Sequence, residues 1–334
     1  MIVINPWLKL MRPKQWFKSF YIIFGSLPAI FLMPMKPDVI ILFLSLGILN
    51  MILIQGVMYI TNDIADLKAD RLHPKKKNRP IASGKISVRE ALIFSLFLFS
   101  LALIIAFMLD FRIVIIDLAL VLNNLLYSFK PIKFKDIKYV DILSASINFP
   151  LRVMVGWFLF EPYNQARLTF SYNFISTESI SNSIQSIIFN SHPRIIELFL
   201  KFSTVTLSFV SIMLLTYFFA VFLLSLKRLA EKLNIKNAEK IRKSLEYYRP
   251  VELKLIAIFS AMIVLISFVL LSWSLKPILV VLSPFALLMM IWYYKLTFLK
   301  NSIVTAPEDI FTKMSKFVIV AIAICLLALI ILFL

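Results

Sequence analysis

Three carboxylates stand at the end of a long apolar run. Asp63, Asp66 and Asp70 are spaced i, i+3 and i+7, which places them on one face of a continuous helix. Like charges on one face repel each other, so a counterion is required. Hard oxygen ligands suit Mg²⁺, which usually bridges a few carboxylates to phosphate oxygens. The spacing therefore predicts a divalent-cation site, although a solvated juxtamembrane face with local salt bridges has the same pattern.

Basic residues follow the carboxylates directly and recur in other polar segments of the chain. Those that could contact a phosphate as cations are Lys14, Arg71, Lys75, Lys77, Arg79, Lys130, Lys133, Lys135, Lys138, Lys227 and Arg228. Each basic residue could instead be a positive-inside topology signal. Lys14, beside Trp16, could belong to an interfacial anchor. Lys227 could form a helical i,i+4 pair with Glu231. Asp136 and Asp141 could be salt-bridge partners for the neighbouring lysines.

One arginine lies deep inside an apolar segment. Arg152 follows Asp141, Ser144, Ser146 and Asn148 in the predicted span 139–160. An arginine at that depth costs on the order of 2.5–3.5 kcal/mol on insertion scales. We therefore expect it to face a polar cavity, an anion or a buried carboxylate.

Composition identifies the class of protein. The 334 residues are 60% hydrophobic with a mean hydropathy of +0.89, above the range of soluble domains. Cys325 is the single cysteine, so disulfide frameworks and cysteine metal sites are excluded, and the two histidines fall in predicted loops. The net charge of +18 indicates membrane topology first and an anionic substrate second. No nucleic-acid partner is expected.

The apolar segments predict an all-α polytopic membrane protein in one domain, residues 1–334. A span needs roughly 20 apolar residues. Nine segments qualify: 16–33, 38–61, 88–109, 112–128, 139–160, 204–226, 251–272, 276–295 and 314–334. Most of the 36 Lys and Arg residues fall on one side of this arrangement, which predicts a cytoplasmic N-terminus and cytoplasmic basic loops in the plasma membrane. A Ser- and Asn-rich stretch at about 161–203 is expected to be an extracytoplasmic loop insertion.

These features together predict a reaction class. A cationic rim around a carboxylate-bound metal, opening into an apolar interior, suits a diphosphate headgroup and a long lipid. No GxxxxGK nucleotide loop and no nucleophile–base pair stands out in the sequence. Metal-assisted departure of diphosphate from carbon is the chemistry that fits.

The motif Asn62-Asp63-x-x-Asp66-x-x-x-Asp70 resembles the first Asp-rich motif of the UbiA superfamily of intramembrane prenyltransferases, which has nine transmembrane helices. Further stretches resemble the decaprenyl-phosphate phosphoribosyltransferase branch: 12–18, 70–84, Tyr127-Ser-Phe129 and Lys227-Arg228-Leu-Ala-Glu231. That branch moves 5-phosphoribose from phosphoribosyl diphosphate to a polyprenyl phosphate.

The resemblance implies roles for particular residues. Asp63 and Asp66 would hold Mg²⁺ on the diphosphate, and Asp70 would support them as the third catalytic carboxylate. The substrate-binding set would be Lys14, Asn62, Arg71, Lys75, Lys77, Arg79, Tyr127, Lys130, Lys133, Arg152, Lys227 and Arg228.

One departure from the wider family bears on substrate choice. Ordinary prenyltransferases of this kind carry a second Asp-rich DxxxD motif after the sixth span, where this chain has Lys227 to Glu231. The change favours phosphoribosyl transfer. Two alternatives stay open: prenyl transfer from prenyl diphosphate to an aromatic, haem or glycerol-phosphate acceptor, and a transporter or lipid-binding membrane protein.

Overall fold

The computed structural model describes residues 5–32, 35–72, 76–160, 184–234, 242–299, 302–305 and scattered positions from 320 to 331; for residues 184–202 it describes the backbone only. The described chain is helical, with no strand among these residues. The elements in order are α1 (Pro6–Leu10), η1 (Pro13–Tyr21), α2 (Ile22–Leu32), α3 (Pro37–Ala65), α4 (Leu67–Leu72), η2 (Lys76–Asn78), α5 (Val88–Leu109), α6 (Phe111–Ser128), η3 (Phe134–Asp136), α7 (Val140–Phe158), α9 (Ile184–Asn234), α11 (Ser244–Tyr247), α12 (Pro250–Leu275), η4 (Pro277–Leu282), α13 (Ser283–Leu296) and η5 (Ile303–Thr305).

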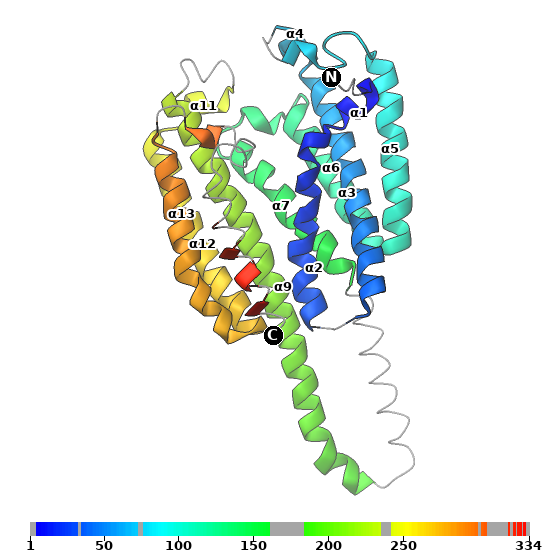
Figure 1. The fold of residues 1–334 in the computed structure, drawn as a ribbon, viewed down its shortest axis with the longest axis vertical. Helices are drawn as coiled ribbons and strands as arrows, with labels where there is room; N and C mark the ends of the chain where they lie inside the picture. The colour runs from blue at the N-terminus through cyan, green and yellow to red at the C-terminus, as the bar shows by residue number, and fades with distance from the viewer. Residues whose placement is uncertain are drawn as a thin grey trace.

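The long helices form a bundle, and the short elements α1, α4 and α11 lie together at one end of it (Figure 1). We call this end the α4 end. Six described segments are long and apolar enough to cross a membrane: α3, α5, α6, the Ser203–Asn234 part of α9, α12 and Pro277–Leu296. The chain is therefore an integral membrane protein.

The predicted spans 16–33 and 139–160 correspond to η1 with α2 and to α7, which are shorter or more polar than the six. The predicted span 314–334 lies mostly outside the described residues. The count of nine spans and the orientation of the N-terminus therefore stay predictions. The predicted loop at 161–203 is helical from Ile184 onward, because α9 begins there and continues into the next span.

Two hydrophobic clusters make up the core. The first joins α2, α3, α5 and α6 and includes Val155 and Trp157 of α7. The second joins α9, α12 and α13 and includes Ile142 at the other end of α7. Helix α7 therefore links the two halves of the bundle.

The helix ends follow local chemistry. Ser87 and Glu90 form a capping box at the start of α5, in which each side chain binds the other's backbone N–H. Asp110 accepts a hydrogen bond from the backbone N–H of Arg112 and so caps α6. The polar residues between spans thus specify where each helix begins.

Helices α2 and α7 approach each other backbone to backbone. A Cβ placed on Gly156 would lie 1.8 Å from the carbonyl oxygen of Ile22, and one on Gly25 would lie 1.9 Å from that of Val153. Ser26 donates from its hydroxyl to the carbonyl of Gly156 across the same contact at 3.1 Å. Small residues permit such close helix packing in membranes.

We predict that Gly156→Ala destabilises the fold, because its Cβ would meet rigid backbone and force α2 and α7 apart. Overpacking of this kind costs about 1–3 kcal/mol. The matched control is Gly47→Ala, whose Cβ would lie 2.6 Å from the flexible Cδ1 of Leu159. Thermal denaturation of both variants in detergent checks this: a Gly156→Ala melting temperature equal to or above that of Gly47→Ala would contradict the packing argument.

Candidate active site at the alpha4 end of the bundle

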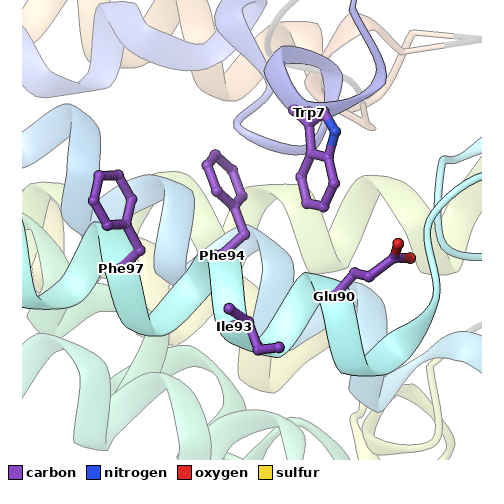
Figure 2. A pocket seen from close by; sticks show the side chains of 5 residues that line it. All are labelled: Trp7, Glu90, Ile93, Phe94 and Phe97. Carbon is purple, nitrogen blue, oxygen red and sulfur yellow. The ribbon is translucent and has the colours of Figure 1, made fainter.

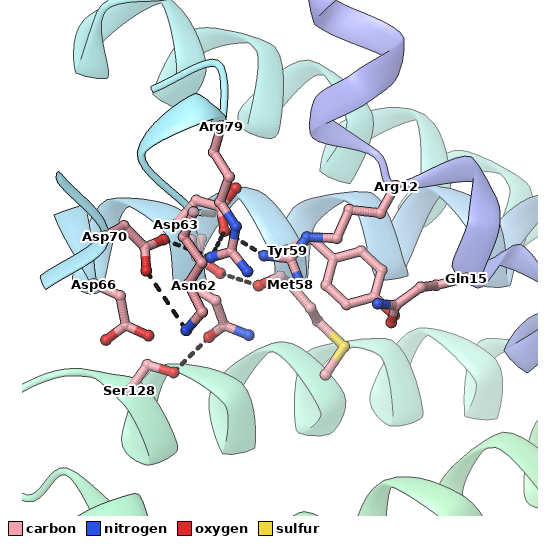
Figure 3. Close-up of polar contacts among 12 residues, drawn as sticks. Arg12, Gln15, Met58, Tyr59, Asn62, Asp63, Asp66, Asp70, Arg79 and Ser128 are labelled. Carbon is pink, nitrogen blue, oxygen red and sulfur yellow. Dashed lines mark hydrogen bonds and ion pairs between the residues drawn. The ribbon is translucent and has the colours of Figure 1, made fainter. Parts of the chain in front are cut away.

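The Asp63 carboxylate is buried between two arginines from different parts of the chain. Asp63 lies near the end of α3 with 4% of its side chain exposed. The guanidinium of Arg12 donates to its Oδ1, and Arg79 Nη1 donates to the same oxygen at 3.0 Å (Figure 3). Burial of a carboxylate is tolerated when such partners balance its charge.

Arg79 also joins Asp70 to the cluster. Its Nη1 donates to Asp70 Oδ2 at 2.5 Å, and Lys76 lies 3.7 Å from the other oxygen of Asp70. Asp70 is 2% exposed. Both hydrogen bonds of Arg79 use one nitrogen, and no other hydrogen bond of its guanidinium occurs among the described residues. Since a guanidinium has five N–H donors, several remain available for another acceptor.

Asp66 takes a different direction from the other two carboxylates. Helix α3 ends at Ala65, with Asp66 as its C-cap, and α4 begins at Leu67. The Asp66 carboxylate accepts a hydrogen bond from Lys135 of η3 and is 34% exposed. The expected continuous helix is therefore interrupted at Asp66, so the three carboxylates do not share one helix face. Each of them is instead compensated by neighbouring cationic side chains.

The turn geometry around the cluster orients its arginines. Arg12 has φ 49°, a left-handed conformation that non-glycine residues seldom adopt. This conformation links α1 to η1, and the Arg12 guanidinium lies 4.7 Å from the ring centroid of Tyr59. Gly84, at φ 77°, closes the predicted turn that follows Arg79 and Pro80.

Hydrogen bonds fasten α3 to α6 beneath the carboxylates. Ser128 donates from its hydroxyl to Asn62 Oδ1 at 2.5 Å. One turn away on α6, Asn124 Nδ2 donates to the hydroxyl of Thr61, the residue before Asn62, at 2.8 Å. The predicted substrate residue Asn62 therefore lies beside Asp63. Its amide oxygen accepts the Ser128 hydrogen bond, which also fixes the orientation of its amide nitrogen.

A second buried carboxylate organises the opposite part of the α4 end. Asp141, at the start of α7, is fully buried and accepts from Arg228 Nε at 2.9 Å, Ser244 Oγ at 3.1 Å and the Tyr248 hydroxyl at 2.6 Å. Arg228 also donates to Glu231 at 3.2 Å. Much of the guanidinium of Arg228, predicted to bind phosphate, is therefore engaged in joining α9 to α7.

The same cluster holds the segment around α11 against the bundle. Burial, followed by the charge of the Asp141 carboxylate, raises the pKa of Tyr248, so its hydroxyl remains a donor. Arg242 donates to the hydroxyl of Tyr127 at 2.8 Å and lies 3.8 Å from Asp141. Tyr127, a predicted substrate residue, is thereby connected to this cluster.

The remaining predicted residues differ in their burial and in their partners. Lys133 pairs with Asp136 at 2.8 Å, and Lys227 is half-buried. Arg152 is buried in α7. Lys75 lies outside the described residues, and the exposed predicted cations are Lys14, Arg71, Lys77 and Lys130.

Arg12, Lys135 and Asp141 are prominent in the clusters but were not in the predicted catalytic or substrate-binding set, although Lys135 was a candidate phosphate contact and Asp141 a candidate salt-bridge partner. Arg12 lies in the basic segment before η1, and Lys135 among the lysines after Tyr127, so both had a compositional signal. Their partners lie 51 and 69 residues away, and nothing in the local sequence identifies them.

An apolar hollow of about 390 Å³ lies between Trp7 of α1 and helix α5. Figure 2 shows Phe94 and Phe97 on α5 beside the Trp7 ring, with Glu90 nearer the helix start. Its lining is almost wholly apolar, as suits a surface in contact with lipid. None of the acidic residues of the Asp63 cluster lines it.

The donor chemistry of the Asp63 cluster fits a hard divalent cation. Asp63, Asp66 and Asp70 offer only oxygen ligands, which Mg²⁺ prefers. Among the described residues, no group of three or more His, Cys, Asp or Glu side chains is arranged to hold a metal ion by itself. A cation here would therefore need further oxygen ligands, such as those of a phosphate-bearing substrate.

Comparison with known proteins gives a family match. Residues 22–245 match the sequence profile of the UbiA prenyltransferase family. A decaprenyl-phosphate phosphoribosyltransferase of Corynebacterium glutamicum is 31% identical over 160 residues, 45% of this chain and 44% of that protein. A digeranylgeranylglyceryl phosphate synthase of Methanosphaera stadtmanae is 25% identical over 176 residues, 53% of this chain and 60% of that one. The chain thus spans less than two thirds of each relative's length.

The fold also matches a solved structure along nearly its whole length. A UbiA homolog from Archaeoglobus fulgidus, bound to DMAPP and Mg²⁺, aligns with a TM-score of 0.62 over 96% of this chain and 99% of that chain. The sequence identity is 16%, so this likeness concerns the fold alone.

We predict that Asp141→Asn destabilises the protein by about 3 kcal/mol, because it leaves the buried Arg228 with Glu231 as its remaining anion. Asp136→Asn is the matched control: its pair with Lys133 is partly exposed, so its loss should cost less than about 1 kcal/mol. Denaturant titration in mixed micelles measures both free energies of unfolding. Equal values for the two variants would contradict the structural role of Asp141.

Proposed function

The chain belongs to the UbiA prenyltransferase family, and on that premise we propose that it transfers 5-phosphoribose from phosphoribosyl diphosphate to a polyprenyl phosphate in the membrane. The relatedness to decaprenyl-phosphate phosphoribosyltransferases supports this substrate pair. The enzyme would be a phosphoribosyltransferase with an intramembrane active site.

The observation that carries the proposal is the carboxylate content of the two clusters, which is three in the Asp63 cluster and two, Asp141 and Glu231, in the Asp141 cluster. The Asp63 cluster contains three carboxylates with cations beside them, as a metal-bound diphosphate requires. The Asp141 cluster contains Arg228 and Arg242 around its buried carboxylate, and no second Asp-rich motif. A donor with one diphosphate and an acceptor with a monophosphate would need only one carboxylate-rich metal site.

Arg12 and Arg79 would bind the donor substrate. Each contacts Asp63 through one guanidinium nitrogen, and the two side chains are 23% and 26% exposed. Their remaining N–H groups would donate to diphosphate oxygens, for which arginine geometry is well suited. Lys76, beside Asp70, would add a point charge.

The reaction needs little proton transfer from the protein. An ionised oxygen of the lipid phosphate would attack the anomeric carbon, the bond from that carbon to the diphosphate oxygen would break, and diphosphate would leave with the bond's electron pair. The arginines would stabilise the charge that develops on diphosphate. A poised histidine base is not required for this step.

Mg²⁺ is the cofactor we propose, held by Asp63 and Asp66, where it would supply Lewis-acid stabilisation to the departing diphosphate. The Archaeoglobus fulgidus homolog was solved with Mg²⁺ and DMAPP, which supports a metal-bound diphosphate in this fold. Asp70 would keep Arg79 in position.

We further propose that the α4 end faces the cytoplasm of a cell whose plasma membrane contains the protein. Most Lys and Arg residues outside the spans belong to segments predicted on that side. Phosphoribosyl diphosphate is soluble and would reach the site from that compartment.

Prenyl transfer is the second candidate function. The family match and the relatedness to digeranylgeranylglyceryl phosphate synthase favour it. The two reactions differ in the donor: a sugar diphosphate in one and a prenyl diphosphate in the other.

A radiolabel assay separates the two candidates. Purified protein in detergent would receive labelled phosphoribosyl diphosphate, a polyprenyl phosphate and Mg²⁺, and label is expected in the lipid fraction. Omission of the lipid phosphate or chelation of the metal should prevent its appearance. Consumption of prenyl diphosphate with a non-phosphoribosyl acceptor, and no sugar label in lipid, would overturn the first proposal.

We predict that Asp63→Asn lowers this transfer on the order of 10²-fold or more, because the change removes charge from the metal site. Asp38→Asn is the control, since Asp38 is an exposed carboxylate near the opposite end of α3. It should retain the rate of the unmodified protein. An Asp63→Asn rate equal to that of the control would remove Asp63 from the site.

A further inference from the structure

Arg152 is buried, and the part of the chain that the structure describes supplies no anion for its charge. Its side chain is 7% exposed, and its Nε is buried with no hydrogen-bond acceptor. No hydrogen bond or ion pair to Arg152 occurs among the described residues; its electrostatic neighbours are the hydroxyl-bearing rings of Tyr21 and Tyr59. A buried cation without an anion is strongly unfavourable in a membrane protein, so this arrangement calls for an anionic ligand.

The fold holds Arg152 in place rather than leaving it mobile. It lies on α7 one turn before Gly156, where α2 and α7 meet backbone to backbone. Phe149, on the preceding turn of α7, stacks against Tyr21 with ring centroids 5.3 Å apart. These contacts fix the backbone of α7 at Arg152, whose side chain is 7% exposed, so an anionic ligand would have to enter the bundle to reach it.

The position of Arg152 connects it to the Asp63 cluster. Its neighbour Tyr59 precedes Asp63 by one turn of α3, roughly 6 Å along the axis. The ring of Tyr59 contacts Arg12, which binds Asp63, and its hydroxyl donates to Gln15 Oε1 at 2.8 Å. An anion at Arg152 would therefore lie close below a substrate held at Asp63.

The depth of Arg152 selects the kind of anion. It follows Asp141 by about three turns, roughly 16 Å along the axis of α7, in the direction away from the α4 end. A soluble diphosphate that interacts with Asp63, Arg12 and Arg79 would remain nearer that end. A phosphate attached to a long apolar chain can reach the deeper position because its chain remains among apolar side chains.

We propose that Arg152, together with the hydroxyl of Tyr21, binds the phosphate monoester of the acceptor lipid. The assignment rests on the proposed function, since it names the acceptor half of the same site. Donor and acceptor phosphates would then occupy separate cationic groups, Arg12 with Arg79 above and Arg152 below. This separation keeps the attacking phosphate oxygen apart from the departing diphosphate.

Lipid-phosphate binding can be measured without turnover. The full-length protein in detergent and chelator is titrated with farnesyl phosphate, while thermal stability and direct binding are recorded. Arg152→Met should weaken this binding on the order of 10- to 100-fold, as expected for loss of charged hydrogen bonds, and Arg152→Lys should retain part of it. Arg112→Met, which removes an arginine stacked 4.3 Å from the Phe158 ring, is the matched control and should retain full affinity.

The stability of the ligand-free variant separates binding from structure. An unpaired buried cation gives the fold no net support, so Arg152→Met should melt at or above the temperature of the unmodified protein without lipid, yet lose the stabilisation by farnesyl phosphate. A large loss of stability without lipid would overturn the proposal, because it would show that Arg152 supports the fold.

Three further probes identify the anion. Farnesol should bind equally to Arg152→Met and to the unmodified protein, since it has no phosphate. Arg152-dependent binding of inorganic phosphate with the same affinity as farnesyl phosphate would overturn the lipid assignment, and so would weaker binding of inorganic diphosphate to Arg152→Met. Arg152-dependent farnesyl phosphate binding without phosphoribosyl transfer would refute the proposed function and leave this inference intact.

Discussion

The buried ion cluster at Asp63 is the constraint on which the α4 end depends. One carboxylate oxygen receives Arg12 from the N-terminal segment and Arg79 from the segment after α4, so parts of the chain 51 and 16 residues away are drawn onto α3. Removing a carboxylate from water is costly, and these arginines offset that cost. The same contact leaves arginine donors next to a carboxylate, which is the arrangement a metal-bound diphosphate would use.

A second buried carboxylate performs a different task. Asp141 accepts from Arg228 of α9 and from Tyr248, and so fixes the polar connection after α9. Between these two clusters, α7 packs against α2 through Gly25 and Gly156 and contributes Arg152, for which no anion is found among the described residues. One helix thereby joins both halves of the core and carries a charge to the interior. The bundle therefore contains three separate polar regions: the carboxylate-rich Asp63 cluster, the structural Asp141 cluster and the deeply placed Arg152.

Much of this arrangement follows from sequence patterns, and the rest depends on tertiary contacts. The apolar runs predict α3, α5, α6 and α12 closely, and the Asp spacing identifies the correct end of α3 as chemically special. The break of the helix at Asp66 could not be predicted, because Lys135 stabilises the new direction from 69 residues away. Arg228 looked like a free cation for the same reason: its partner Asp141 is 87 residues distant. Local sequence patterns indicate the periodicity and charge of a segment. The partners of its charged side chains depend on which distant segments the fold brings together.

The central claim is that the Asp63 cluster binds the diphosphate of phosphoribosyl diphosphate. The most direct test is an experimental structure of the purified protein with Mg²⁺ and this compound. We expect a metal ion between the diphosphate and the carboxylates of Asp63 and Asp66, with phosphate oxygens on the remaining guanidinium nitrogens of Arg12 and Arg79. A ribose diphosphate bound elsewhere, or a site that accepts prenyl diphosphate and excludes the sugar, would contradict it.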